Sequence, residues 1–544
     1  MINAIEFIGR GLTRPDRVSR ATTWQALALW GPALVVAAIV LMPIVYLSLR
    51  AVEAGPSTWE SLFRWRTLQL VLRTLGLALS VTGISTIVAV PLAWFTTRTD
   101  LPARRIWAVL TALPLVIPSY VGAYLVVAAL GPRGILQGWL ERLFNVSRLP
   151  DIYGFPGALL VLTLLSYPYI LLSVRGALVR MDPALEEASR SLGWGPWQTF
   201  WRVTLPQLRP ALAGGGLLVA LYVLRDFGAV SIMRYNTFSR VIYIEYQSSF
   251  DRQAAATLSL LLVAMTSGLL ALEMRTRGLA RYHANGVGAS RPPSLLRLGR
   301  WRWPATVLCA AVVGVALILP AGVLGYWLVR GIQAGQQPAP LWTAARNSFL
   351  ASGLAAGAVL VAALPTVVLN VRRPGRLSQL LERLTYAGYA LPGVVVALAL
   401  VFFGTRYVRP LYQTLPMLIV AYGILFLPQA AGAVRASLLQ VHPSLKEAAR
   451  SLGRSPLNVF VTIDLPLIRP GVAAGAALVF LTTMKELPAT LILGPPGFRT
   501  LATAVWSAVS EAFFARAAAP ALLLILVSSL PAAFLILRGQ RSEL

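Results

Sequence analysis

Apolar residues in this chain gather into long uncharged runs that are separated by short polar segments. An α-helix needs roughly 20 consecutive apolar residues to cross the hydrocarbon core of a bilayer. Two segments, 211–233 and 471–493, are apolar over such a length but each contains one pair of charged residues. Ten further runs carry no charge: 28–49, 74–97, 106–131, 154–174, 254–272, 304–329, 347–371, 384–405, 410–434 and 517–537. The pattern predicts about twelve transmembrane helices, and hence an all-α integral membrane fold.

The composition supports this interpretation. Hydrophobic residues make up 57% of the chain and charged residues only 12%, whereas a soluble domain carries roughly 25% charged residues. The mean hydropathy is +0.69. Backbone groups in lipid must be satisfied within the protein, so only helices and closed barrels span a membrane, and these runs are too long for barrel strands.

The net charge is +28, and the arginines that produce it lie at the ends of the predicted spans. The segment 275–302 contains arginines and no acidic residue, and the N-terminal tail carries Arg10, Arg14, Arg17 and Arg20. By the positive-inside rule both segments are cytoplasmic, and an even number of spans then places both termini in the cytoplasm. The basic excess therefore reflects topology, with binding of anionic lipid as the alternative. Nothing in this distribution indicates a nucleic-acid partner.

The chain contains an internal repeat. The stretch "EEASRSLGWGPWQTFWRVTLPQLRP" at 186–210 returns 260 residues later as "KEAARSLGRSPLNVFVTIDLPLIRP" at 446–470. Such a repeat predicts two six-helix units of the same orientation, related by a pseudo-twofold axis along the membrane normal. We expect a first repeat at 1–274, a basic cytoplasmic linker at 275–303 and a second repeat at 304–544. The interface between the repeats is the expected substrate route.

Both copies of this stretch fall in a predicted cytoplasmic loop between the fourth and fifth spans, at 183–210 and 443–470. Each reads as two short helices. Gly193 and Gly453 suit the left-handed residue that stops the first helix. The dipeptide of Leu205 and Pro206 is expected to end the second, because a residue before proline avoids the helical region. Aromatic residues such as Trp197 suit either a protein interface or the lipid headgroup level.

The loop resembles a motif of a known family. The run Glu187, Ala188 and Ser189, then Gly193 and then Val-Thr-Leu-Pro at 203–206, is similar to the "EAA" loop of ATP-binding-cassette (ABC) importer permeases, and the second copy is closer still. The resemblance implies the type I importer permease fold. It also implies that each loop docks onto a cytoplasmic ATPase, so that two ATPase subunits bind one chain. The implied ATPase-coupling residues are Glu187, Ala188, Arg190, Gly193, Pro196, Glu447, Ala448, Arg450, Gly453 and Pro456.

The chain offers no site for ATP hydrolysis or other catalysis. A phosphate-binding loop needs the sequence Gly-Lys-Ser/Thr, and the only two lysines, Lys446 and Lys485, follow Leu and Met. ATP and Mg²⁺ are therefore expected on the partner ATPase, and this chain needs no cofactor of its own. With two histidines and the single Cys309, we find no catalytic or metal-binding constellation. A membrane enzyme remains the weaker alternative.

The only charge pairs inside predicted spans are Arg225 with Asp226 and Lys485 with Glu486. The two pairs occupy equivalent positions of the two fifth spans. Charges within a membrane usually face a cavity or each other. We expect these four residues to line the translocation path or its outer gate. Two alternatives remain, namely a structural ion pair or a span that ends earlier. Adjacent residues on a helix do not face each other, so pairs across the two repeats are equally consistent.

The segments "KELPATLIL" from Lys485 and "FRTLATAVW" from Phe498 are similar to the fused two-domain permeases of ferric-iron importers. This resemblance implies a bacterial inner-membrane protein that receives Fe(III) from a periplasmic or lipid-anchored binding protein. Related permeases carry thiamine, phosphonates or polyamines, which stay open as alternatives. A proton-coupled secondary transporter is the more distant alternative. The loop "RTDLPARR" at 98–105 lacks the G-x-x-x-D-R/K-x-G-R/K sequence that one large class of these transporters carries after the second span.

Overall fold

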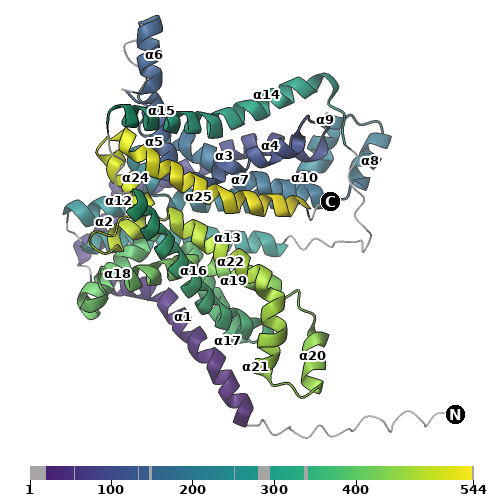
Figure 1. Ribbon diagram of the computed structural model, residues 1–544, viewed down its shortest axis with the longest axis vertical. Coiled ribbons are helices and arrows are strands. Elements are labelled where there is room, and N and C mark those ends of the chain that lie inside the picture. Colours follow the sequence, from purple (N-terminus) through teal and green to yellow (C-terminus); the bar gives the residue numbers. More distant parts are fainter. Residues whose placement is uncertain are drawn as a thin grey trace, which may run out of the picture.

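A computed structural model describes residues 20–53, 55–132, 134–145, 150–249, 252–279, 295–335 and 341–541. The regular secondary structure of this part of the chain consists of helices and one isolated β-bridge (Figure 1). Ten helical segments in it are long and apolar enough to cross a membrane, or eleven if one bent pair counts as a single span. The arginines at 10, 14 and 17 and the linker residues 280–294 lie outside the described residues.

The twelve predicted spans all correspond to helices. In the first repeat the unbroken spans are α1 (Arg20–Val52), α3 (Trp65–Arg98), α7 (Phe155–Arg180) and α13 (Arg252–Leu279). Their counterparts in the second repeat are α14 (Arg302–Val313) with η5 (Gly314–Ile318) and α15 (Leu319–Gln333), then α16 (Leu341–Arg372), α19 (Leu415–Leu438) and α25 (Phe514–Arg541). Short connecting helices are α2 (Pro56–Leu62), α6 (Ile135–Phe144), α12 (Phe238–Ile244), η3 (Glu245–Ser249), η4 (Gly299–Trp301), η7 (Arg409–Leu411) and α24 (Leu501–Ser510).

The third span of each repeat is broken, which corrects the continuous helices expected at 106–131 and 384–405. The first is divided into α4 (Arg104–Leu110), η1 (Leu113–Val116) and α5 (Ser119–Leu130), and the second into α17 (Arg376–Tyr386), η6 (Ala387–Ala390) and α18 (Gly393–Tyr407). The reason is proline. Ile117 and Leu391 precede Pro118 and Pro392 and are extended, with ψ of 123° and 115°, because a residue before proline avoids the helical region. The third span of the second repeat bends by 106° at this point.

The fifth span of each repeat is also broken, and the break falls at the charged residues. In the first repeat α10 (Leu205–Arg225) stops at the arginine, and α11 (Gly228–Ile232) begins two residues after Asp226. The second repeat has the same arrangement in α22 (Leu465–Lys485) and α23 (Pro488–Leu493). The charges therefore lie at helix ends and not within the continuous helices that the apolar pattern suggested for 211–233 and 471–493.

The two repeats are interlocked through their outer helices. Buried residues of α1 and α13, such as Leu47 and Leu262, belong to the same apolar core as α16, α18, α19 and α22 of the second repeat. Conversely, buried residues of α14, α15 and α25, such as Leu324 and Leu524, belong to the core formed by α3, α5, α7 and α10. Figure 1 shows α1 lying against α16 and α17. Each repeat thus completes the hydrophobic core of the other.

The end of the linker is fixed to the first repeat. Leu296 forms a parallel bridge with Thr99 directly after α3, and its N–H donates to the carbonyl of Arg98 at 2.9 Å. The Asp100 carboxylate accepts from the Leu298 N–H at 2.8 Å.

The two repeats differ at helix α6. This helix extends from the end of α5 (Figure 1), where the second repeat has only the short helix η7.

The close packing of α10 against α7 requires a glycine at position 215. A Cβ at Gly215 of α10 would lie 2.9 Å from the Cα of Ile170 in α7, whereas a Cβ at the neighbouring Gly214 would meet nothing within 4 Å. Small residues at such points let membrane helices approach closely. We predict that Gly215→Ala lowers stability by about 1–3 kcal/mol through overpacking.

The measurement is thermal unfolding of the purified protein in detergent, with Gly214→Ala as the matched control. The control should be neutral or stabilising, because alanine favours a helix over glycine by about 1 kcal/mol. Equal unfolding temperatures for the two variants would contradict the close approach of α10 and α7.

Candidate functional site: coupling loops and interface charges

The two repeated loops lie on the same side of the molecule. The first consists of α8 (Ala184–Ser191), α9 (Pro196–Thr199) and the π turn η2 (Phe200–Thr204). The second consists of α20 (Pro443–Ser451), α21 (Pro456–Val459) and the π turn η8 (Phe460–Asp464). In Figure 1, α8 and α20 both lie toward the right of the view, away from α2 and α18. This agrees with repeats that share one orientation.

Gly193 and Gly453 end the first short helix of each loop in the left-handed conformation, with φ of 88° and 77°, which confirms the sequence prediction. The turn is closed by a hydrogen bond from the Trp194 N–H to the Ser189 carbonyl at 3.2 Å, and by the equivalent bond from Arg454 to Ala449 at 3.1 Å. These bonds satisfy carbonyls that the helix end leaves free. A residue with a Cβ would be strained at both glycines.

The second short helix does not end at Leu205 and Pro206, which corrects the sequence prediction. The Leu205 N–H donates to the carbonyl of Phe200 across the π turn, and the chain continues directly into α10. Pro206 lies in the first turn of α10, where a missing N–H is tolerated. The segment Pro196–Arg225 is therefore one continuous helical span of 30 residues. The second repeat has the same continuity through Leu465.

Most of the expected coupling residues are accessible. Glu187, Ala188, Gly193 and Pro196 are exposed, and Arg190 is half-buried. In the second loop, Glu447, Ala448, Arg450 and Gly453 are exposed, and Pro456 begins α21. Large apolar side chains accompany them, with Leu192 78% and Leu452 82% exposed. Each loop thus presents charged and apolar groups that nothing in the described chain covers.

A buried carboxylate that the sequence analysis did not single out holds each loop to the membrane helices. In the first loop this is Glu186, whose side chain is 4% exposed and lies 3.9 Å from Arg98 Nη1 and 3.6 Å from Arg190 Nη2. In the second loop it is Asp464, which is fully buried and pairs with Arg372 and with Lys446. Burial lowers the pKa of the Lys446 ammonium, and the nearby guanidinium groups of Arg372 and Arg450 lower this pKa further.

At the other end of the fifth span, the two acidic residues bind backbone N–H groups. The Asp226 carboxylate accepts from the N–H groups of Ala229 and Val230 at 3.0 and 3.2 Å. The Glu486 carboxylate accepts from Ala489 and Thr490 at 2.9 and 3.0 Å. The first N–H groups of a helix have no partner inside the helix. Asp226 and Glu486 therefore cap the short helices α11 and α23.

The two basic residues connect the repeats. Arg225 Nη1 donates to the carbonyl of Tyr389 in η6 at 3.3 Å, and Lys485 Nζ donates to the carbonyl of Leu115 in η1 at 3.3 Å. Leu115 and Tyr389 occupy equivalent positions, each three residues before the proline that breaks the third span. The two contacts are therefore related by the pseudo-twofold symmetry. No ion pair within Arg225 and Asp226, or within Lys485 and Glu486, occurs among the described contacts.

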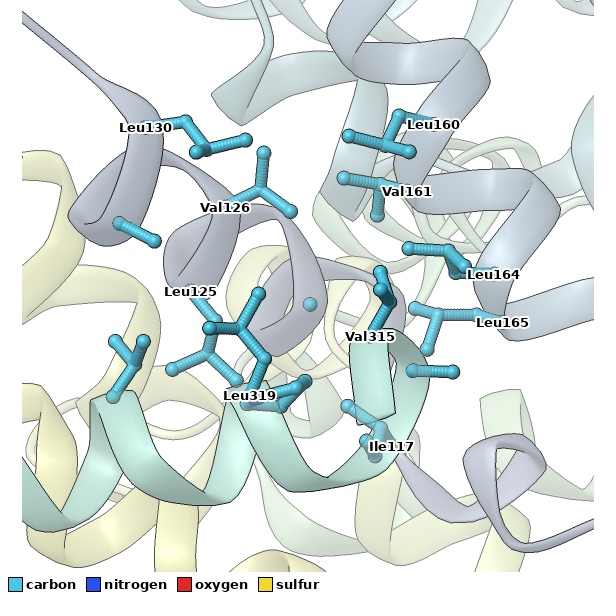
Figure 2. Close-up of a pocket in the computed structure, with 15 residues that line it drawn as sticks. Ile117, Leu125, Val126, Leu130, Leu160, Val161, Leu164, Leu165, Val315 and Leu319 are labelled. Carbon is cyan, nitrogen blue, oxygen red and sulfur yellow. The ribbon is translucent and has the colours of Figure 1, made fainter. Parts of the chain in front are cut away.

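A pocket of about 60 Å³ lies between α5, α7 and the helices η5 and α15. Figure 2 shows aliphatic side chains of these elements pointing into it, including Leu125, Leu165 and Leu319. Such a lining suits hydrocarbon and not a polar or charged substrate. Within the described residues there is no group of three or more His, Cys, Asp or Glu side chains that could hold a metal ion, and Cys309 is buried.

Two membrane-embedded helical repeats, each with an exposed helical loop on the same side, define a two-repeat transport permease. The family described as "Binding-protein-dependent transport system inner membrane component" matches the chain twice, at residues 82–276 and 358–537. The chain therefore belongs to this family and is a multi-pass membrane protein with two copies of its domain.

Several relatives share much of the sequence. The chain is 37% identical to the Fe(3+)-transport system permease protein FbpB 2 of Haemophilus influenzae over 90% of this chain and 94% of that protein. It is 26% identical to the ferric transport system permease protein FbpB of Actinobacillus pleuropneumoniae over 84% of this chain and 70% of that protein. The sulfate transport system permease protein CysW of Escherichia coli is 28% identical over 45% of this chain and 87% of that protein. Proteins of the size of one repeat thus exist as separate permeases.

The caps at Asp226 and Asp182 provide a matched pair of variants. Asp226→Ala would leave the buried N–H groups of Ala229 and Val230 without their acceptor, and we predict a loss of stability of about 1–3 kcal/mol. Asp182 accepts from the Ala184 N–H at 2.9 Å but is exposed, so water can replace it and Asp182→Ala should cost less. Thermal unfolding of both variants is the measurement. An Asp226→Ala protein that is as stable as the wild type but transports nothing would contradict the capping role.

Proposed function

We propose that this chain is the permease subunit of an ABC importer for ferric iron. The single observation that carries the transporter class is the doubled loop, which exposes a glutamate and a leucine at equivalent positions twice on one side of the molecule. The proposal of iron as substrate is supported by the 37% identity to a relative named as an Fe(3+)-transport permease over nearly the full length of both proteins. The same permease class with thiamine, phosphonate or polyamine as substrate is the alternative.

In this proposal each loop docks onto one cytoplasmic ATPase subunit, which binds ATP and Mg²⁺. A periplasmic or lipid-anchored binding protein delivers the substrate from outside, at the interface of the two repeats. The protein then resides in a bacterial inner membrane with both termini in the cytoplasm. ATP binding moves the two loops together and opens the outer side, and hydrolysis returns the permease to the inward-facing state.

The helix that follows the first loop explains how docking reaches the membrane interior. Pro196–Arg225 is one continuous helical segment of 30 residues, which at 1.5 Å per residue extends over about 45 Å. Its cytoplasmic end lies in the docking loop and its other end carries Arg225, which binds Tyr389 of the second repeat. A displacement of the loop therefore acts on a contact between the repeats. We assign Arg225, Asp226, Lys485 and Glu486 to the gate of the translocation path on this basis.

The proposal is tested in proteoliposomes that contain this chain with its ATPase and binding protein. Uptake of labelled Fe(III) is measured with and without ATP while the proton gradient is collapsed. We expect uptake that requires ATP. If iron does not enter but thiamine- or phosphonate-loaded binding protein stimulates ATP hydrolysis, the transporter class is retained and the substrate is wrong. Uptake that needs only the proton gradient would contradict the whole proposal.

Exposed acids of the loops provide a sharper test of docking. We predict that Glu447→Arg lowers ATP-driven uptake about tenfold, because reversing one charge at the centre of an interface costs at least about 1.4 kcal/mol of binding. Since Glu447 is exposed, insertion and thermal stability should stay unchanged. The control is Glu60→Arg in α2, which is also exposed but lies far from the loops (Figure 1). Wild-type uptake by the Glu447→Arg protein would remove the second loop from the docking surface.

A further inference from the structure

The two loops are attached to the membrane helices through the same three positions, but these positions carry different residues. The first repeat has Arg98, Glu186 and Thr204, and the second has Arg372, Lys446 and Asp464. The arginine ends the second span, the middle residue lies in the first short helix of the loop, and the third residue ends the π turn before the fifth span. The carboxylate thus lies in the loop helix of one repeat and in the π turn of the other.

In the first repeat, Glu186 connects three elements. Its Oε1 accepts from the hydroxyl of Thr204 at 2.8 Å, and its Oε2 lies 3.9 Å from Arg98 Nη1. Arg98 is itself 2% exposed and also donates to the carbonyl of Met181, directly after α7, at 3.3 Å. A single buried carboxylate therefore holds the loop helix α8 to the ends of α3 and α7 and to the start of α10.

In the second repeat, Asp464 performs the same task from the opposite side. Its Oδ2 binds Arg372 at the end of α16, and its Oδ1 lies 3.3 Å from Lys446 Nζ in α20. The loop helix now contributes the cation and the π turn contributes the carboxylate. Both arrangements place one buried carboxylate between the loop helix, the π turn and the arginine of the second span.

A second pair of positions in the loops differs in the same coordinated way. In the first loop the hydroxyls of Ser189 and Thr199 lie 3.0 Å apart and are buried. The equivalent positions in the second loop are Ala449 and Val459, both buried and apolar. Both positions thus differ together, with a hydrogen-bonded pair in the first loop and an apolar pair in the second. The contacts within each loop are maintained although the residues that make them differ.

We propose that Arg98 with Glu186, and Arg372 with Asp464, are positioning residues that transmit the movement of the docked loop to the second and fifth spans. Each arginine requires one buried carboxylate, and this carboxylate acts equally well from the loop helix or from the π turn. The inference rests on the proposed function, since it assumes that the loops bind an ATPase. A buried charge without its partner is strongly unfavourable, so the loop and the spans have to move together.

The carboxylate lies at different positions in the two repeats, and this difference defines the experiment. It compares the wild type, two single variants and their double variant in the first repeat. Glu186→Lys places a cation beside Arg98 and Arg190, and Thr204→Asp places a second carboxylate beside Glu186. The double variant Glu186→Lys/Thr204→Asp reproduces the arrangement of the second repeat. We expect each single variant to lower the iron transported per ATP hydrolysed by about tenfold, and the double variant to recover to within about threefold of wild type.

The ratio of iron to ATP is chosen because a purely structural defect would lower the amount of active protein but not this ratio. Protein level in the membrane and retention of the ATPase on the purified permease are measured in the same preparations, with Glu60→Lys as the control for charge reversal. A double variant as impaired as the single variants would overturn the proposal. Wild-type ratios in both single variants would overturn it as well.

The second repeat provides an independent cycle if a single variant of the first does not accumulate in the membrane. There, Asp464→Thr and Lys446→Glu are the single variants, and the combination reproduces the first repeat. Recovery in the combination supports the proposal, and its absence overturns it. Failure of the proposed function looks different, because the wild-type protein would then import no iron. In that case we compare the retention of the ATPase on the purified permease across the same variants. Recovery of this retention in the combination supports the proposal, and its absence overturns it.

Discussion

Backbone groups that are freed where a helix breaks inside a membrane protein have to find partners without the help of water, and this requirement shapes the centre of the structure. The third and fifth spans of both repeats are broken. Asp226 and Glu486 bind the free N–H groups of α11 and α23, and Arg225 and Lys485 bind carbonyls of the broken third spans in the opposite repeat. In a medium of low dielectric such bonds matter more than in water. The charged residues thus close the helix breaks and join the two repeats.

The rest of the architecture connects this centre to the two exposed loops. The outer helices of each repeat complete the core of the other, so separating the repeats would disrupt both cores. The first loop continues without a break into the helix that ends at Arg225. The buried carboxylates Glu186 and Asp464 hold the loops to the ends of α3 and α16. Each loop is therefore attached to both the second and the fifth span of its repeat.

Much of this could be predicted from the sequence, because it depends on local patterns. Runs of apolar residues predicted the spans, the repeat predicted the shared orientation, and Gly193 predicted a left-handed helix end. The breaks at Pro118 and Pro392 were missed because hydropathy averages over single residues, although the prolines themselves were visible. Glu186 and Asp464 were missed because their arginine partners are distant in the chain. Opposite charges at the equivalent positions 186 and 446 were the one available signal, and they required a comparison of the two repeats.

The central claim is that the two loops move together when ATP binds and that this movement drives transport. Trp201 and Val461 occupy equivalent positions of the two π turns and are each 51% exposed. The only cysteine of the chain, Cys309, is buried and therefore shielded from the labelling reagent. Spin labels at Trp201→Cys and Val461→Cys report the distance between the loops in the assembled transporter by pulsed electron paramagnetic resonance. The account predicts a shorter distance with bound ATP than without nucleotide. An unchanged distance in a preparation that carries out ATP-driven uptake would contradict it.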